Sequence, residues 1–260
     1  MPTRKVEKVV SLQHIRVACL ECSLNEICLP VGLESNELDR LDAIIERRRP
    51  LSRGEHLFHT DDDFQAIYAV RAGSLKTYAS SERGQEQVMG FHLPGELIGL
   101  DAIAGNRYPL SARALETTSV CEIPFTNLED LSRQLPGLQH ELLRVMSREI
   151  HDDEQNMVIL GQKSAEERLA SFLIGLSNRF RRRGFSANQF NLSMSRGDIG
   201  NYLGLALETV SRLFTRFQND GLLSVDRKHV ELLDRDRLCS FSGASCSAEP
   251  SARRESSQSN

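Results

Sequence analysis

The chain has 260 residues, of which 40% are hydrophobic and 26% are charged, and its formal net charge is −4. This composition is that of a globular protein with one large domain or two ordinary ones. No apolar run approaches the roughly 18 residues that a membrane helix needs, and the first ten residues lack the apolar core of a signal peptide. We therefore expect a cytoplasmic protein with no membrane segment.

The charge is unevenly distributed along the chain. Residues 164–238 hold 12 Lys or Arg and 9 Asp or Glu, which gives +3, so the remainder carries −7. A basic module joined to an acidic one is typical of a protein in which one part contacts nucleic acid.

Residues 1–30 form an arm that holds Cys19, Cys22 and Cys28. Two thiols separated by two residues can bind one metal ion or one corner of a cluster with little chain strain. In the cytoplasm we expect all six cysteines to be reduced, so clustered thiols favour metal or redox chemistry over disulfides.

A tetrahedral site or a cubane cluster needs a fourth ligand. Cys121, on a predicted strand, is the first candidate, and Cys239 is a weaker one because it lies in the DNA-binding part. Three interpretations stay open from spacing alone. They are an iron–sulfur cluster, a structural zinc site whose second pair of cysteines is missing, and unrelated thiols in apolar surroundings.

Residues 31–135 are predicted to form a small β-roll, so that the whole chain belongs to the α+β class. A short amphipathic helix begins near Ser35 and carries Leu38 and Leu41 on one face. Short apolar or alternating runs separated by glycines follow, which indicates many short strands. The predicted strands are Glu55–His59, Ala66–Ala72, Leu75–Ala79, Gln87–Phe91, Ala112–Leu115 and Val120–Ile123.

Residues 136–163 are predicted to be a dimerisation segment made of one long helix from about Pro136 to Gln162, and proline suits a first turn. Apolar residues mostly recur at steps of three and four, in a narrow stripe like a coiled-coil seam. The alternative is a helix that packs only on its own domain. We expect a homodimer contact, because symmetric DNA readers need a two-fold partner, made by Leu142, Met146, Ile150, Asp153 and Met157.

Residues 164–238 contain a predicted helix-turn-helix. Ser195 and Asp198 fit an N-cap and its capping box, and a helix is predicted from Arg196 to Leu203. Gly200 leaves room for a close crossing, and Gly204 follows the last turn. A second helix runs from Leu207 to Gln218, and a basic β-hairpin wing follows. The remaining residues, 239–260, are predicted to be a disordered tail.

The exposed face of the second helix distinguishes this segment from an ordinary pair of helices. Glu208, Ser211 and Arg212 lie near its N-terminus, the end that enters the major groove, and their side chains can bond base edges. Contacts to the DNA backbone are expected from Thr215, Arg216, Asn201 and Tyr202.

The order of parts resembles the CRP/FNR superfamily, and the details resemble its oxygen-sensing FNR/ANR branch. The likeness covers about residues 15–238 and rests on stretches such as CLECSLNEICLP, GFHLPGELIGLDAI, ALETTSVCEIPF and RGDIGNYLGLALETVSRLFTRFQ. It implies an oxygen-labile [4Fe–4S] cluster on Cys19, Cys22, Cys28 and Cys121. With the cluster present the family dimerises and binds DNA, and oxygen abolishes both.

The resemblance also implies several residue roles. Two Asp153 carboxylates would repel one another across the dimer axis, and Ile150 would shield them. Glu208, Ser211 and Arg212 would read a TTGAT-N4-ATCAA palindrome, although Leu207 stands where valine is more usual. Contacts with RNA polymerase would lie near Ala72, Gly84 and Thr117.

The sequence fits other signals and activities less well. The cyclic-nucleotide branch needs an Arg-Ser pair after its Gly-Glu-Leu turn, and Tyr108-Pro109 stands there instead, so we expect no cyclic nucleotide. Haem-based nitric-oxide sensors generally lack the cysteine arm. A regulator with structural zinc or another signal such as nitric oxide is the main alternative. An iron–sulfur enzyme is disfavoured, because no cluster of acid–base residues is evident.

Overall fold

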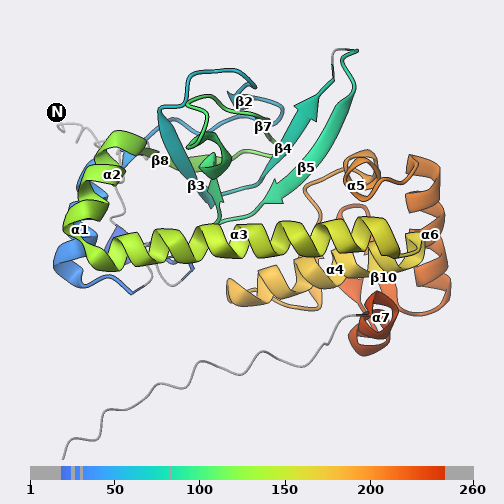
Figure 1. The fold of residues 1–260 in the computed structure, drawn as a ribbon. Helices are drawn as coiled ribbons and strands as arrows, with labels where there is room; N and C mark the ends of the chain where they lie inside the picture. The colour runs from blue at the N-terminus through green and yellow to red at the C-terminus, as the bar shows by residue number, and fades with distance from the viewer. Residues whose placement is uncertain (1–18, 25–26, 30–31, 82, 244–260) are drawn as a thin grey trace, which may run out of the picture. The chain divides into compact units, whose positions relative to one another are not determined.

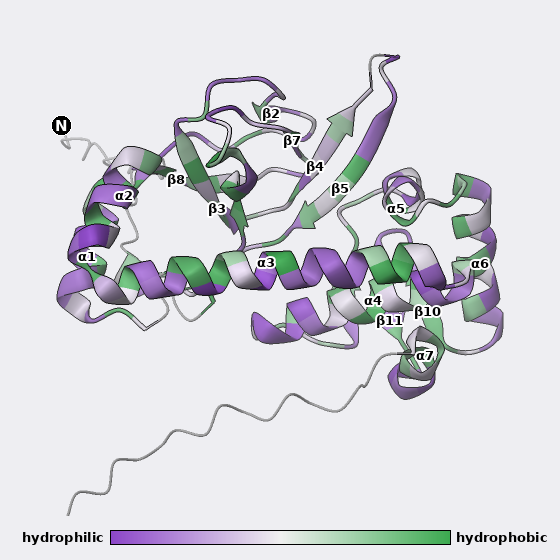
Figure 2. Cartoon of the chain, in the orientation of Figure 1, coloured by the Kyte–Doolittle hydropathy of each residue, from purple (hydrophilic) through white to green (hydrophobic). Residues whose placement is uncertain are grey.

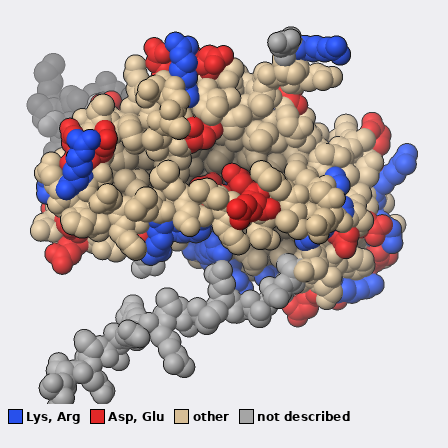
Figure 3. Space-filling model, in the orientation of Figure 1, with Lys and Arg blue, Asp and Glu red and all other residues tan. Residues whose placement is uncertain are grey.

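A computed structural model describes residues 19–24, 27–29, 32–81 and 83–243. The chain divides into two compact units, one ending at Ile150 and one beginning at His151. The division falls within helix α3 (Pro136–Gln162), which has the bounds that the sequence predicts. Figure 2 shows hydrophobic and hydrophilic residues alternating along α3. On the face in Figure 3, basic and acidic residues are interspersed.

Unit 1 is built around two four-stranded antiparallel sheets (Figure 1), as predicted for a β-roll. One sheet has the order β1-β8-β3-β6 and the other β2-β7-β4-β5. Their bounds are β1 Glu46–Arg47, β8 Ser119–Pro124, β3 Ala66–Ala72 and β6 Leu97–Ile98, and then β2 His56–Phe58, β7 Ser111–Ala114, β4 Leu75–Ser80 and β5 Glu86–His92. Each predicted strand is confirmed to within two residues, whereas β1 and β6, of two residues each, were not predicted.

Two cores lie on opposite faces of the sheet that contains β8. One is built by both sheets and includes Phe58, Tyr68 and Tyr108. The other lies between β8, β3 and the helices α1 (Ser35–Ile44), α2 (Phe125–Gln134) and α3. Because side chains alternate along a strand, Val120 joins the first core, while Cys121 packs against the second.

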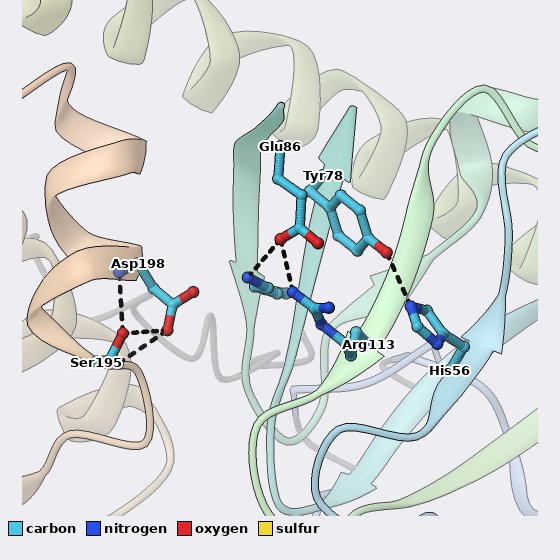
Figure 4. Close-up of polar contacts among 7 residues, drawn as sticks. His56, Tyr78, Glu86, Arg113, Ser195 and Asp198 are labelled. Carbon is cyan, nitrogen blue, oxygen red and sulfur yellow. Dashed lines mark hydrogen bonds and ion pairs between the residues drawn. The ribbon is translucent and has the colours of Figure 1, made fainter. Parts of the chain in front are cut away.

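The sheet β2-β7-β4-β5 carries a polar cluster (Figure 4). The Glu86 carboxylate accepts hydrogen bonds from Lys76 Nζ at 3.2 Å and from Arg113 Nη2 at 2.6 Å. His56 Nε2 lies 2.8 Å from the Tyr78 hydroxyl. Lys76 is buried, so its charge needs the Glu86 partner, and the cluster ties β4, β5 and β7 together.

In its described residues, unit 2 contains the second part of α3, the helices α4 to α7 and a three-stranded antiparallel sheet of order β10-β11-β9. Its elements are α4 Ala165–Arg182, β9 Gln189–Asn191, α5 Arg196–Leu203, α6 Leu207–Asn219, β10 Leu223–Asp226, β11 His229–Leu232 and α7 Arg235–Ser242. The two predicted helices of the helix-turn-helix are confirmed, as is the wing, whose turn contains Arg227 at φ 56°.

The last helix corrects the predicted tail. Asp234 caps α7 by accepting a hydrogen bond from the Arg237 N–H, and Leu238 and Cys239 are buried. Residues 239–242 are therefore helical and not disordered. The rest of the tail, 244–260, lies outside the described residues, and so do residues 1–18 of the arm.

Candidate functional site

Four free cysteines meet at one pocket of unit 1, although they come from separated segments. Cys19 lies in the short 3-10 helix η2 (Cys19–Glu21), Cys22 and Cys28 follow in the arm, and Cys121 lies on β8. The pocket measures about 420 Å3 including its open mouth. Its wall consists of Cys19, Cys22, Leu24, Cys28, Leu29, Leu41, Ile45, Ala69, Val70, Arg71, Cys121 and Ile123.

Local hydrogen bonds and strand register place these thiols. The Cys22 N–H donates to the Cys19 carbonyl at 3.2 Å, and the Cys28 N–H donates to the Leu24 carbonyl at 2.9 Å, so the arm coils tightly. Cys121 is paired in register with Arg47 of β1 on one side and with Ala69 of β3 on the other. The thiol of Cys121 therefore sits at the centre of a sheet that the arm covers.

The pocket favours protonated thiols when nothing is bound. Burial, with the Asp42 carboxylate as a second cause, raises the pKa of Cys19 to about 12. Burial also raises the pKa of Cys28 to about 12. Burial raises the pKa of Cys121 as well, and the positive charges of Arg47 and Arg71 oppose this increase. A metal that binds here must displace protons, because the thiolate is the ligand.

The four thiols line the wall of one pocket. Among the residues that the structure describes, no three His, Cys, Asp or Glu side chains form a group that could hold a single metal ion. A zinc ion requires four donors at about 2.0–2.3 Å from one centre. An iron–sulfur cluster takes its thiolates at separate iron atoms, so it does not require all four sulfur atoms to meet one centre.

Cys239 is not a fifth candidate. It is buried in α7 of unit 2 and is disulfide-bonded, so the expectation that all six cysteines are reduced is wrong at this position. Cys246 lies outside the described residues.

The helix-turn-helix of unit 2 forms for the local reasons that the sequence indicated. The Ser195 hydroxyl accepts the Asp198 N–H at 3.0 Å (Figure 4), which caps α5. Gly204 ends α5 at φ 63°, in the left-handed region where glycine is favoured. Gly200 lies so close to the turn that a Cβ there would stand 2.6 Å from the Leu205 carbonyl oxygen.

Helix α6 presents a polar face opposite an apolar one. Its buried side chains are Val210, Leu213, Phe214 and Phe217, while Glu208, Ser211 and Arg212 are exposed. The Ser211 hydroxyl donates to the Leu207 carbonyl at 2.9 Å. That bond leaves the oxygen of Ser211 facing outward as an acceptor. The predicted base-reading residues thus share one accessible face.

The residues predicted to contact the DNA backbone differ from one another in exposure and in their partners. Thr215 is exposed and Asn201 is half-buried. The Arg216 guanidinium forms an ion pair with Glu166 and lies 3.7 Å from Asp220, so a phosphate would have to compete with two carboxylates. Tyr202 is half-buried and its ring lies 5.9 Å from that of Phe172, which makes it a packing residue.

Helix α3 carries an exposed apolar seam that differs from the prediction at one position. Leu143, Ile150 and Met157 are 60%, 60% and 72% exposed and lie seven residues apart. Met146 and Leu160 continue the alternating steps of three and four. Leu142, by contrast, packs against the core of unit 1. Leu143 is therefore the more exposed of the two adjacent leucines, and Leu142 is half-buried against unit 1.

Asp153 lies on the seam one turn after Ile150 and is exposed. Burial and the neighbouring Asp152 raise the pKa of its carboxyl. The ionised form is thus already disfavoured in a single chain.

The remaining predicted residues lie at turns or inside the roll. Ala72 and Thr117 are exposed, and Gly73, next to Ala72, lies against the Thr117 backbone. Gly84 is exposed in the β4–β5 hairpin turn. Tyr108 is buried, stacks on Phe58 at 3.8 Å between ring centroids and donates to the Ala66 carbonyl at 2.6 Å.

Comparisons with known proteins agree with this architecture. The Crp-like helix-turn-helix domain family matches residues 167–241, and the cyclic nucleotide-binding domain family matches residues 48–134. None of the helices in the described part of the chain combines the length and the apolarity needed to cross a bilayer.

Similarity to individual proteins extends over most of the chain. The transcriptional activator protein Anr of Pseudomonas protegens is 55% identical over 239 residues, which cover 92% of this chain and 98% of that protein. The fumarate and nitrate reduction regulatory protein of Escherichia coli is 45% identical over 243 residues, which cover 94% and 97%. The structure of FixK2 from Bradyrhizobium japonicum is similar with a TM-score of 0.71 and 31% identity, over 77% of this chain and 98% of that one. The chain therefore belongs to the FNR/Anr branch of the CRP/FNR family of transcription regulators, which bind DNA and are not enzymes.

Proposed function

We propose that this regulator responds to oxygen through a [4Fe–4S] cluster held by Cys19, Cys22, Cys28 and Cys121. The observation that carries the proposal is that these four free thiols line one pocket. The similarity to the transcriptional activator protein Anr and to the fumarate and nitrate reduction regulatory protein supports the same assignment.

The residues around the pocket have definite tasks in this proposal. When bound, the cluster supplies an inorganic centre that oxygen destroys. The four thiols release their protons and become ligands. Leu24, Leu29 and Ile45 exclude water from the pocket wall, and Arg71 offsets part of the added negative charge. A zinc ion held by the same thiols is the alternative cofactor.

The domain organisation that we infer has an arm (1–30), a sensor roll (31–135), a dimerisation helix (136–163), a DNA-binding domain (164–238) and a tail (239–260), whose first residues fold as the end of α7. Two copies would pair along the seam of α3 through Leu143, Met146, Ile150 and Met157. Two Asp153 carboxylates would then face one another and make the dimer marginal. Such a dimer can respond to a modest change at the sensor.

Base reading is assigned to α6. Glu208, Ser211 and Arg212 would contact a TTGAT-N4-ATCAA palindrome, with Arg212 suited to the two acceptors of guanine. Thr215, Arg216 and Asn201 would contact the DNA backbone. The regulator would then activate or repress genes of anaerobic metabolism, with Ala72, Gly84 and Thr117 near the surface that meets RNA polymerase.

We infer that the roll does not respond to cyclic nucleotides, although its family is named for them. Tyr108 stands where the phosphate-binding pair would be, and its ring packs among Phe58, Phe64 and Tyr68 in the interior. An aromatic side chain in a close-packed core leaves no cation for a phosphate.

The test is to isolate the full chain without oxygen and to measure iron and sulfide before and after exposure to air. We expect about four of each per chain and loss of operator binding in air. Cys121→Ser should lose the cluster, whereas Cys239→Ser, outside the pocket, should retain it. An iron-free protein that binds its operator equally well with and without air would overturn the proposal, and a zinc-loaded colourless protein would support the alternative.

A further inference from the structure

The carboxylate of Asp42 connects the segment that holds Cys19 to strand β1, which lies beside Cys121. Asp42, near the end of α1, accepts the backbone N–H of Cys19 at its Oδ1 atom, at 3.1 Å. The same oxygen accepts Arg47 Nη2 at 2.6 Å. Arg47 lies on β1, where it is the register partner of Cys121. The two side chains are only 25% and 20% exposed.

The position of this contact in the arm distinguishes it from an ordinary surface ion pair, which contributes little to stability. The backbone hydrogen bonds that Cys22 and Cys28 donate end on carbonyls within the arm. The bond from Cys19 to Asp42 instead ends on a helix of the roll. It therefore anchors the start of the described arm to unit 1 at the site of a thiol.

The charges around Asp42 also bear on how the thiols are brought together. Four thiolates gathered at one pocket repel one another, and a further carboxylate beside Cys19 would add to that repulsion. The ion pair with Arg47 offsets part of this repulsion. The carboxylate still raises the pKa of the Cys19 thiol, so the backbone bond must contribute more to assembling the ligand set than this charge costs. The Arg47 guanidinium also lies close enough to Cys121 to interact electrostatically with its thiol.

We propose that Asp42 and Arg47 form a clamp that positions Cys19 against Cys121 so that all four thiols can bind the cluster. Both are positioning residues, since neither is itself a ligand. The inference rests on the proposed function and adds to it the residues that assemble its ligand set.

The experiment compares iron binding by full-length variants reconstituted with ferrous iron and sulfide in the absence of oxygen. Outer residues that orient metal ligands typically contribute 10–100-fold to affinity. We therefore expect Asp42→Ala to lower the apparent iron affinity by about tenfold, measured by competition with an iron chelator. The visible absorption of the iron–thiolate bonds should change as well. Asp42→Asn keeps an oxygen that accepts the Cys19 N–H, and should recover most of the loss.

Two further variants separate the clamp from a general loss of stability. Arg47→Gln leaves α1 unaltered and should bind iron more weakly than the parent. Arg49→Ala removes an exposed pair with Glu55, 2.5 Å apart, and should bind iron like the parent. Circular dichroism of the iron-free variants checks that each one folds.

The outcomes distinguish the two proposals. A parent protein that takes up no iron and sulfide refutes the proposed function itself. If the parent takes up both, then Asp42→Ala with parental iron affinity refutes the clamp. Asp42→Asn that binds as poorly as Asp42→Ala would also refute it, because the bond to Cys19 would then have no part in assembling the site.

Discussion

A single methyl group added at Gly200 tests how closely the turn of the helix-turn-helix is packed. Gly200 lies in α5, and a Cβ built there would stand 2.6 Å from the Leu205 carbonyl oxygen and 3.4 Å from Val210 Cγ2. Carbon and carbonyl oxygen ordinarily approach to about 3.3 Å. The atom in the way belongs to the backbone and cannot rotate aside, so the turn itself must move.

The expected cost follows from three contributions. Overpacking of this kind typically costs about 1–3 kcal/mol. The turn also holds a hydrogen bond from the Leu205 N–H to the Gly200 carbonyl, at 2.8 Å, whose loss costs about 1 kcal/mol. Alanine regains about 0.5–1 kcal/mol over glycine within a helix. Gly200→Ala should therefore destabilise the turn by about 1–3 kcal/mol.

Hydrogen exchange measured by mass spectrometry suits this prediction, because it reports local opening of the peptides that cover α5 and α6. The predicted cost corresponds to exchange about 5–150 times faster than in the parent. Gly175→Ala is the matched control. It lies within α4, and a Cβ there would meet nothing within 4 Å, so this variant should be slightly more stable. Parental exchange rates in Gly200→Ala would show that the turn is looser than described.

Three further changes probe the DNA-reading face and the seam of α3. Arg212→Ala should weaken operator binding by about 1–3 kcal/mol in a fluorescence anisotropy titration, and an unchanged affinity would remove Arg212 from base reading. Asp153→Ala should shift sedimentation in air toward the dimer. The parent should shift the same way as the pH falls, because the raised pKa of the Asp153 carboxyl lets protonation remove the repulsion at a higher pH than for an ordinary aspartate. Equal monomer fractions in parent and variant at every pH would contradict the repulsion. Leu143→Ala should weaken the dimer, whereas Leu142→Ala should lower the unfolding free energy of unit 1 by about 2 kcal/mol in urea titrations. A dimer weakened by Leu142→Ala and not by Leu143→Ala would place Leu142 in the dimer contact.

Much of the fold could be predicted from local patterns. The bounds of α3 followed from the apolar steps after Pro136, and those of α5 from the Ser195 cap and Gly204. Elements without such signals were missed. Helix α2 begins directly after strand residue Pro124 with no side-chain cap, and a two-residue strand such as β1 is too short to show a period. Helix α7 had a signal, the cap at Asp234, but the polar composition of the tail obscured it.

The candidate sites were predictable to different degrees. The polar face of α6 follows from helical spacing, so Arg212 could be placed in advance. Spacing grouped Cys19 with Cys22 and Cys28, but it named Cys121 only as a candidate, because a strand pairing at long range brings that residue to the pocket. Spacing alone could not decide which of Leu142 and Leu143 is the more exposed. Adjacent positions border the same narrow stripe, and only the packing of the roll decides which one is covered.

The core beneath the cysteine pocket also includes residues at the start of the long helix α3. Leu29 and Ile123 share that core with Leu135, the residue before α3, and with Leu138 in the first turn of α3. Close-packed interiors transmit small displacements because they contain few voids to absorb them. A displacement of the arm should therefore reach the first turn of α3 through direct contacts in this core, without a separate hinge between them.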